Sequence, residues 1–260
     1  MTPGAPTAAM AGLPDAFRLI AVDRVDSTNA AARRLAGEGA PDNTVVWARE
    51  QTGGRGRRGR AWASPRGNLY ASFLIRTGTD FTTAGQLGFA AALALDDAVQ
   101  RELPAGVRTA LKWPNDLLVD GRKVAGILLE SVTDAAANLD AVILGVGLNI
   151  ARAPTDASYP TGTLIGAGAR ADLDPGEVLA ALASHFQARC DVWRARGFLP
   201  LRDAWLRRAK GMGEPITVRL PQDTLHGTFH DLDSDGALIL RQSTGLEQRI
   251  HVGDVFFGSA

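Results

Sequence analysis

The sequence has little of what would cross-link the chain or place it in a membrane. Its 260 residues contain one cysteine, Cys190, which excludes an internal disulfide and has no metal-ligand spacing around it. We interpret Cys190 as a core residue of a helix and infer a reducing, cytoplasmic setting. No apolar run approaches the roughly 20 residues of a membrane span, so a transmembrane helix is excluded.

The N-terminus lacks a targeting signal. Residues 1–15 carry no basic residue and no long apolar stretch, both of which a secretory signal peptide needs. We therefore expect a short disordered tail over residues 1–15.

An excess of charge of either sign is also missing. Lys plus Arg and Asp plus Glu number 28 each, so the formal net charge is zero. That balance argues against the broad basic face of a nucleic-acid-binding domain. The hydrophobic fraction of 45% and the charged fraction of 22% are those of a globular protein with one large domain, or one large and one small.

One segment departs strongly from this balance. Residues 51–67 contain five glycines, five arginines and no acidic residue, between apolar runs at 44–48 and 69–75. Glycine lets a backbone approach a ligand closely, and arginine binds phosphate or carboxylate through paired hydrogen bonds. The segment predicts a mobile cationic loop that wraps a small polyanion. RNA-binding segments and plain solvated loops share this composition, and at this point both alternatives stay open.

The rest of the chain divides into recognisable elements. Capping residues at 26–29 and Gly37 bound a short helix, and we expect strands at 44–49 and 68–76 and a helix over 83–101. Residues 108–150 show a β pattern with a hairpin turn at Asp120-Gly121. Helices follow at 174–196 and 199–209. Four or five short strands after Gly211 predict a small SH3-like barrel, giving domains at 16–210 and 211–260.

Three motifs in the β region carry chemistry. In Lys112-Trp113-Pro114-Asn115-Asp116, the lysine could stabilise a pentavalent phosphorus and the last two residues could supply oxygen ligands for Mg²⁺, although the same pattern also fits an ordinary surface turn. In residues 123–130, a lysine opens an apolar strand and a small Ala-Gly pair leaves room for a ligand. In residues 145–150, two glycines in a strand indicate that something packs close to the backbone.

Together these segments resemble the biotin protein ligases, also called biotin–acetyl-CoA-carboxylase ligases. The resemblance extends from about residue 20 to the C-terminus and rests on five segments in the family's order: residues 27–29, 51–60, 112–116, 123–126 and 147–149. It implies an α+β fold, with a central mixed β-sheet and helices packed on one side, as in class II synthetases. The small C-terminal barrel also fits.

The resemblance implies two half-reactions. Biotin and MgATP would give biotinyl-5′-AMP and pyrophosphate, and the biotinyl group would pass to a lysine of a biotin carboxyl carrier domain of an acyl-CoA carboxylase. No side-chain nucleophile is needed, and we interpret the four histidines as structural or surface residues. The rival enzyme is a lipoate–protein ligase, which the sequence GRGRRGR and the barrel disfavour. The rival from another class is an RNA-binding module.

The resemblance also implies residue roles. Lys112, Arg57 and Lys123 would be catalytic. Biotin would contact Ser27, Thr28, Asn29, Gln51, Gly54, Arg55, Arg57, Lys123 and Gly126. ATP and the adenylate would contact Arg57, Arg58, Arg60, Trp62, Lys112, Asn115, Asp116 and Asn149, with Asp116 near Mg²⁺.

Two departures from the family pattern matter. Only about 20 residues precede the first motif, too few for the helix-turn-helix of bacterial relatives that act as repressors, so we expect no DNA partner. The adenine-covering loop of relatives sometimes carries a tryptophan, whereas residues 151–163 contain only Tyr159 as an aromatic. We expect residues 53–60 and 151–163 to be mobile without ligand, because the arginines of the first loop are unpaired and repel one another. The oligomeric state stays open, with a homodimer as one option.

Overall fold

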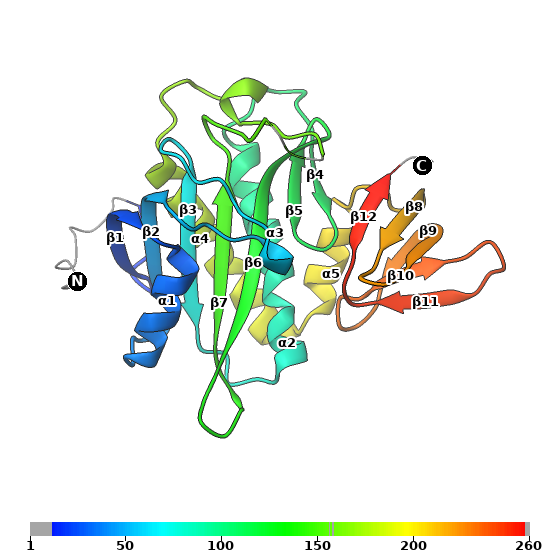
Figure 1. Cartoon of the computed structure of the whole chain (residues 1–260), viewed down its shortest axis with the longest axis horizontal. Coiled ribbons are helices and arrows are strands. Elements are labelled where there is room, and N and C mark those ends of the chain that lie inside the picture. Colours follow the sequence, from blue (N-terminus) through cyan, green and yellow to red (C-terminus); the bar gives the residue numbers. More distant parts are fainter. Residues whose placement is uncertain (1–11, 156, 158, 258–260) are drawn as a thin grey trace.

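A seven-stranded mixed sheet forms the centre of the larger part of the molecule (Figure 1). This computed structural model describes residues 12–155, 157 and 159–257, so most of the tail expected at 1–15 lies outside the described residues. β1 and β2 are parallel and every other neighbouring pair is antiparallel. In spatial order the strands are β1 (Arg18–Val25), β2 (Thr44–Gln51), β3 (Leu69–Ile75), β7 (Leu139–Leu148), β6 (Arg122–Thr133), β5 (Asp116–Val119) and β4 (Thr109–Lys112).

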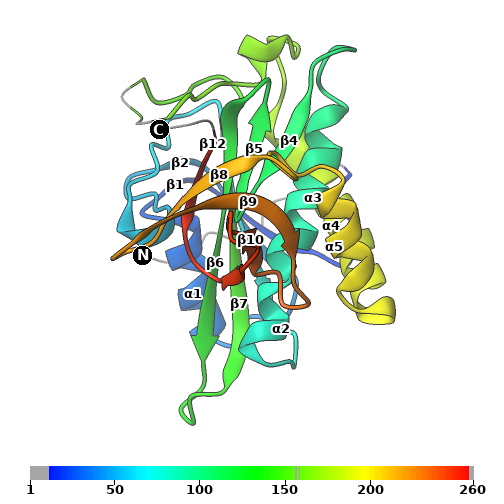
Figure 2. The same ribbon diagram turned by 90° about the vertical axis from the view of Figure 1, so that its right-hand side faces the viewer.

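Helices pack on both faces of this sheet. Successive strand residues point to opposite sides, and apolar side chains on each side form a cluster with a helix. Helices α3 (Leu87–Gln100) and α4 (Pro175–Arg196) pack on one face, with α5 (Leu199–Leu206) beside them (Figure 2). Helix α1 (Thr28–Gly37) lies on the other, where its alanines meet Val46, Leu74 and Ile143. The expectation of helices on one side was therefore wrong for α1. That face stays only partly covered, which leaves room for a site.

Local sequence signals explain most element boundaries. The side chain of Asp174 accepts a hydrogen bond from the backbone N–H of Gly176 at 2.7 Å and caps α4. Asp120 and Gly121 both have positive φ, as a tight hairpin between β5 and β6 requires. The helix expected over 83–101 is instead two helices, α2 (Phe81–Gly85) and α3, separated at Gln86. That side chain is buried and accepts a hydrogen bond from the Trp193 indole at 2.8 Å.

The C-terminal part forms a five-stranded antiparallel sheet (Figure 1). The order is β11 (Glu247–Ile250), β10 (Leu238–Arg241), β9 (Thr224–Leu232), β8 (Pro215–Arg219) and β12 (Asp254–Phe257). Within the described residues β11 and β12 are the two edge strands and do not pair with each other. The sheet is therefore open where a small barrel was expected. The sequence analysis missed two strands, β1 and β12.

Backbone and side-chain hydrogen bonds fix this second sheet against the first. The indole N–H of Trp113 donates to the carbonyl oxygen of Gly236 at 3.1 Å. Leu111 of β4 exchanges backbone hydrogen bonds with Arg208 and Lys210, both at 2.8 Å, so the connecting segment extends the edge of the large sheet. The β4–β5 turn and β12 consequently lie next to each other. Among the described helices, none combines the length and the apolar character needed to cross a bilayer.

Candidate functional site

A cavity of about 630 Å³ opens on the face of the large sheet that α1 covers. Its walls come from the start of α1, the loop over 52–64, the β4–β5 turn, strands β6 and β7, and strand β12. All the site residues predicted from the sequence line it except Arg58: Ser27, Thr28, Asn29, Gln51, Gly54, Arg55, Arg57, Arg60, Trp62, Lys112, Asn115, Asp116, Lys123, Gly126 and Asn149. None of the four histidines lines it.

One end of the cavity is neutral and hydrogen-bonded. The carbonyl oxygen of the Gln51 side chain accepts from the backbone N–H of Thr28 at 2.8 Å and lies 3.1 Å from its hydroxyl. The amide nitrogen of Gln51 donates to Ser64 Oγ at 2.9 Å. Because the Thr28 N–H fixes the orientation of the Gln51 amide, this wall presents its donors and acceptors in a defined order. A dry pocket of this kind suits a neutral polar ring, since an unpaired charge would be costly there.

Glycines let the Trp62 indole lie against the sheet. Gly126 of β6 and Gly147 of β7 are direct neighbours. A Cβ atom would lie 3.2 Å from the Trp62 ring at Gly126 and 2.6 Å from it at Gly147. A Cβ atom on Gly54 would meet Ser64 Oγ at 2.4 Å and the Trp62 carbonyl oxygen at 2.5 Å. The glycines in the two strands therefore bring the indole close to the backbone, a close approach that the sequence signalled without showing which group makes it.

The other end of the cavity is cationic. Lys123 Nζ lies 2.6 Å from Asp116 Oδ1, and both side chains are largely buried. The same ammonium lies 5.4 Å from the Trp62 ring centroid and 5.1 Å from that of Tyr159. These are cation–π distances, and they place Tyr159 on the cavity wall beside a lysine. Two residues of its loop, 156 and 158, lie outside the described part of the chain.

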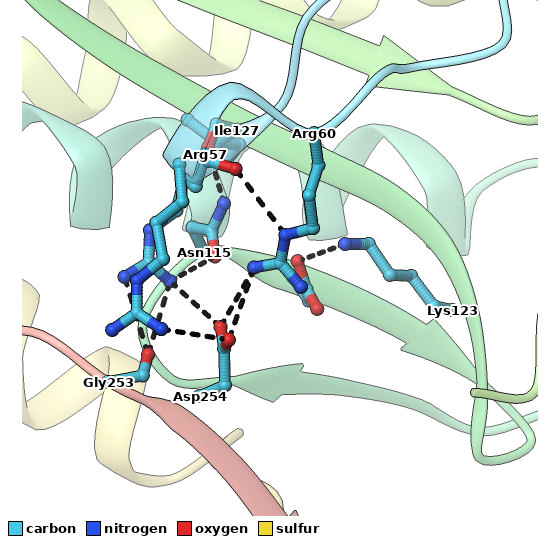
Figure 3. Close-up of polar contacts among 9 residues, drawn as sticks. Arg57, Arg60, Asn115, Lys123, Ile127, Gly253 and Asp254 are labelled. Carbon is cyan, nitrogen blue, oxygen red and sulfur yellow. Dashed lines mark hydrogen bonds and ion pairs between the residues drawn. The ribbon is translucent and has the colours of Figure 1, made fainter. Parts of the chain in front are cut away.

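Strand β12 supplies a carboxylate to the arginine loop (Figure 3). Asp254 accepts hydrogen bonds from Arg60 Nη2 at 3.0 Å and Arg58 Nη1 at 3.3 Å, and its Oδ1 lies 3.9 Å from Arg57 Nη1. Arg57 also donates to the Asn115 amide oxygen at 3.2 Å and to the Gly253 carbonyl oxygen at 3.3 Å. The premise that these three arginines are unpaired was therefore wrong. Arg58 contacts Asp254 and does not line the cavity.

Burial leaves the cavity's cations poorly solvated. Desolvation lowers the pKa of Lys112, which the negative charge of Asp116 partly offsets. Desolvation likewise lowers the pKa of the Arg57 guanidinium. Lys112 Nζ lies 5.6 Å and 5.7 Å from the ring centroids of Phe256 and Phe257 of β12. A polyanion in this cavity would replace the missing water around the cations.

Sequence reasoning missed residues around this cavity, although some signals were present. Asp254 and Ser64 line the cavity, whereas Ser72 and Glu130 stand behind it. Ser72 is a polar residue in the apolar run 69–75, and Glu130 ends the strand motif that begins at Lys123. Asp254 has no local signal, because its partners lie 194 to 196 positions earlier in the chain.

Comparison with known proteins agrees with this arrangement. Residues 21–149 match the biotin/lipoate A/B protein ligase family, and residues 211–258 match the biotin protein ligase C terminal domain. A biotin–[acetyl-CoA-carboxylase] ligase from Paracoccus denitrificans is 44% identical over 90% of this chain and 98% of its own length. The chain belongs to the biotin protein ligase family. A second ligase of this name, from Mycobacterium tuberculosis, is 35% identical over 86% of this chain and 83% of its own length.

Solved structures of biotin protein ligases share the fold. The enzyme from Aquifex aeolicus in complex with biotin and ATP has a TM-score of 0.75 and 27% identity, covering 92% of this chain and 97% of that chain. The enzyme from Leishmania major in complex with biotinyl-5-AMP has a TM-score of 0.65 and 26% identity, covering 90% and 98%. These matches support the interpretation as a biotin ligase and do not favour the lipoate–protein ligase alternative.

Proposed function

We propose that this chain is an ATP-dependent biotin–protein ligase with two half-reactions in one cavity. The biotin carboxylate attacks the α-phosphorus of ATP, and pyrophosphate leaves. The ε-amine of a carrier lysine then attacks the acyl carbon, AMP leaves, and the amide nitrogen loses a proton. The observation that carries this proposal is the polarity of the cavity, with a neutral hydrogen-bonded end joined to a cationic end.

The neutral end suits the ureido ring of biotin. Thr28 and Gln51 offer hydrogen-bonding groups without charge, and Gly54 lets the loop backbone approach the ring. The Trp62 indole lies against Gly126 and Gly147, where it can pack beside the bound acyl group. Ser27, Asn29 and the Arg55 backbone complete this biotin set in the proposal.

The cationic end suits two anions that must react with each other. The biotin carboxylate and the α-phosphate repel one another, and the positive charges of Lys112, Lys123 and Arg57 can offset that repulsion. Asn115 accepts from Arg57 through its amide oxygen and donates to the carbonyl oxygen of Ile127 at 2.6 Å, which fixes the guanidinium. We assign Arg60 and Asn149 to the nucleotide as well, whereas Arg58 lies outside the cavity and pairs with Asp254. Tyr159 lines the cavity beside Lys123, and we assign it to the adenine.

The residues present fit Mg²⁺ bound chiefly through the nucleotide. Among the described residues, Asp116 and Asp254 are the carboxylates that line the cavity, and each is paired with at least one cation. The described residues contain no group of three or more His, Cys, Asp or Glu side chains placed to hold a metal. Mg²⁺ commonly binds one or two carboxylates plus substrate phosphates, so Asp116 is the residue we assign to it. When bound, the ion would neutralise phosphate charge.

The partner that we propose is the biotin carboxyl carrier domain of an acyl-CoA carboxylase. The name of the Paracoccus relative, a biotin–[acetyl-CoA-carboxylase] ligase, supports this choice. We also propose a catalytic domain over 16–210 and a C-terminal domain over 211–260. A reducing, cytoplasmic compartment fits the buried free thiol of Cys190, whose pKa burial raises to about 12.

The transfer reaction tests the proposed function. The purified chain is incubated with ATP, Mg²⁺ and a biotin carboxyl carrier domain, with either biotin or lipoate, and the carrier is analysed by mass spectrometry. We expect one biotinyl group on one lysine and no lipoyl group. Lipoylation without biotinylation would support the rival ligase, and an unmodified carrier with both acids would contradict the proposal.

A further inference from the structure

We propose that Glu130, which does not line the cavity, is a positioning residue for biotin recognition and acts through Asn29. The proposal rests on the proposed function of the cavity. Glu130 Oε2 accepts a hydrogen bond from Asn29 Nδ2 at 2.6 Å. The Asn29 carbonyl oxygen accepts from Ser72 Oγ at 2.6 Å, and Ser72 Oγ lies 2.8 Å from Thr28 Oγ1. A chain of polar contacts thus leads from a carboxylate behind the site to a hydroxyl in its wall.

The carboxylate fixes the orientation of the Asn29 amide. An ionised carboxylate only accepts hydrogen bonds, so the NH₂ group must face Glu130 and the carbonyl oxygen must face Ser72. The reverse orientation would place the amide oxygen against a negative charge. Gly145 makes space for the amide, because a Cβ atom there would lie 2.1 Å from Asn29 Oδ1. Asn29 is 4% exposed and Ser72 is fully buried, so little water reaches the contact between them.

A fixed amide also fixes the hydroxyl protons beyond it. Ser72 is fully buried, and its single hydroxyl group donates its hydrogen bond to the Asn29 carbonyl oxygen. Ser72 Oγ can then only accept from Thr28. The Thr28 proton therefore goes to Ser72 or to Gln51 Oε1, which lies 3.1 Å away. In both cases Thr28 presents only lone pairs to the cavity, as an N–H group of the ureido ring requires.

Removing the charge would remove this constraint. In E130Q the new amide can donate or accept, so Asn29 can turn over and direct its NH₂ group at Ser72. Ser72 then donates to Thr28 and occupies a lone pair that the ligand N–H could use, and the Thr28 proton keeps Gln51 Oε1 as an acceptor but loses Ser72. We expect biotin binding to weaken roughly tenfold, the cost of about one misdirected buried hydrogen bond.

A merely structural role for Glu130 predicts something different. Glu130 Oε1 lies 3.9 Å from Arg33 Nη2 on α1, so the carboxylate could instead serve by holding the helix to the sheet. R33Q removes that ion pair and leaves the Asn29 contact in place, which makes it the matched control. S72A is the second variant, because it interrupts the chain of polar contacts between Asn29 and Thr28.

The experiment measures steady-state adenylation for the wild type, E130Q, R33Q and S72A, with the melting temperature of each. We expect KM for biotin to rise about tenfold in E130Q and in S72A, with kcat at saturating biotin and KM for ATP within about twofold. R33Q should match the wild type. In the S72A background E130Q should add little, because both act through the same hydroxyl.

Three results would overturn the inference. They are an unchanged biotin KM in E130Q, an equal rise in R33Q, and full additivity of E130Q and S72A. If E130Q does not fold, a normal biotin KM in S72A overturns it instead. A wild-type chain that shows no biotin-dependent adenylation contradicts the proposed function itself, which separates the two failures.

Discussion

Lys112 is half-buried, and we propose that it stabilises charge in the reaction. It lies at the end of β4, beside the aromatic residues of β12, and burial lowers its pKa. An ammonium held this way needs no reorganisation when negative charge develops on a phosphate, which is the condition for effective electrostatic catalysis.

Replacing Lys112 by Gln should separate binding from chemistry. Adenylation should slow by about 10²–10³-fold, the usual effect of losing one preorganised donor to a developing anion. The KM for biotin should change little, because the neutral end of the cavity is intact. Single-turnover assays of both half-reactions measure this, and transfer from supplied biotinyl-AMP should suffer less.

Lys210→Gln is the matched control for that variant. Lys210 Nζ lies 5.5 Å from the Phe257 ring centroid but does not line the cavity. The Lys210→Gln variant should adenylate biotin at the wild-type rate. A normal rate in Lys112→Gln, or complete loss of biotin binding, would refute the role of Lys112.

The lowered pKa of Lys112 also sets a pH dependence. The protonated form is the active one, so kcat/KM for ATP should fall as pH rises through the pKa in the free enzyme. Because burial lowers that pKa, the midpoint should lie below the ordinary lysine value of 10.5. Lys112→Arg should be slower but should lack this alkaline limb, since Arg stays protonated. The same limb in Lys112→Arg would assign it to another group.

At the scale of elements, the loop over 52–64 depends on glycine at one position more than at others. A Cβ atom on Gly54 would lie within 2.5 Å of Ser64 Oγ and the Trp62 carbonyl oxygen, and backbone there cannot move without disturbing Trp62. We expect Gly54→Ala to weaken biotin binding by about 5- to 150-fold, the equivalent of the roughly 1–3 kcal/mol that overpacking costs. Isothermal titration with biotin measures the loss.

Gly56→Ala provides the comparison within the same loop. Its Cβ atom would meet nothing closer than 3.6 Å, and its φ of −106° suits any residue. Biotin affinity should be close to that of the wild type. Equal losses in both variants would show that the loop needs flexibility at both positions and not space at Gly54.

The sequence predicted those elements whose signals are local. The hairpin at Asp120-Gly121, the start of α4 at Pro175 and the cationic loop all follow from residue types at short spacing. Strand β1 was missed although residues 19–22 form a short apolar run, because its partner β2 begins 26 positions later and a helix, not a tight turn, connects the two. The polar chain behind the site was missed for the same reason, since Asn29 and Glu130 are 101 positions apart.

At the scale of the whole molecule, the site belongs to both sheets. Asp254 and Phe256 of β12 line a cavity whose other walls come from the large sheet and its loops. Asp254 contacts three arginines of the loop, of which we propose Arg57 and Arg60 for the nucleotide site (Figure 3). The carboxylate therefore anchors the loop to β12, and in the proposed reaction the nucleotide would replace some of those contacts.

Replacing Asp254 by Asn should loosen the loop. Without the negative charge the three arginines repel one another, so cleavage by trypsin within residues 53–60 should be faster in the absence of ligand. Biotinyl-AMP should restore resistance, because its phosphate supplies the missing charge; ordering of this loop by the adenylate stays a prediction. The readout is the rate of limited proteolysis.

Asp235→Asn is the control on the same sheet. Asp235 pairs with Arg249 at 3.0 Å and does not line the cavity. In Asp235→Asn, trypsin should cleave residues 53–60 at the wild-type rate. Equal cleavage of the loop in the wild type and in Asp254→Asn would contradict the anchoring role.

The most direct test of the central claim is biotin-dependent exchange of labelled pyrophosphate into ATP. Exchange requires that the chain form and reverse an acyl-adenylate, and it needs no carrier protein. The account predicts exchange that depends on biotin and Mg²⁺, is absent with lipoate, and is slowed in Lys112→Gln. Exchange supported by lipoate and not by biotin, or none with either acid, would contradict it.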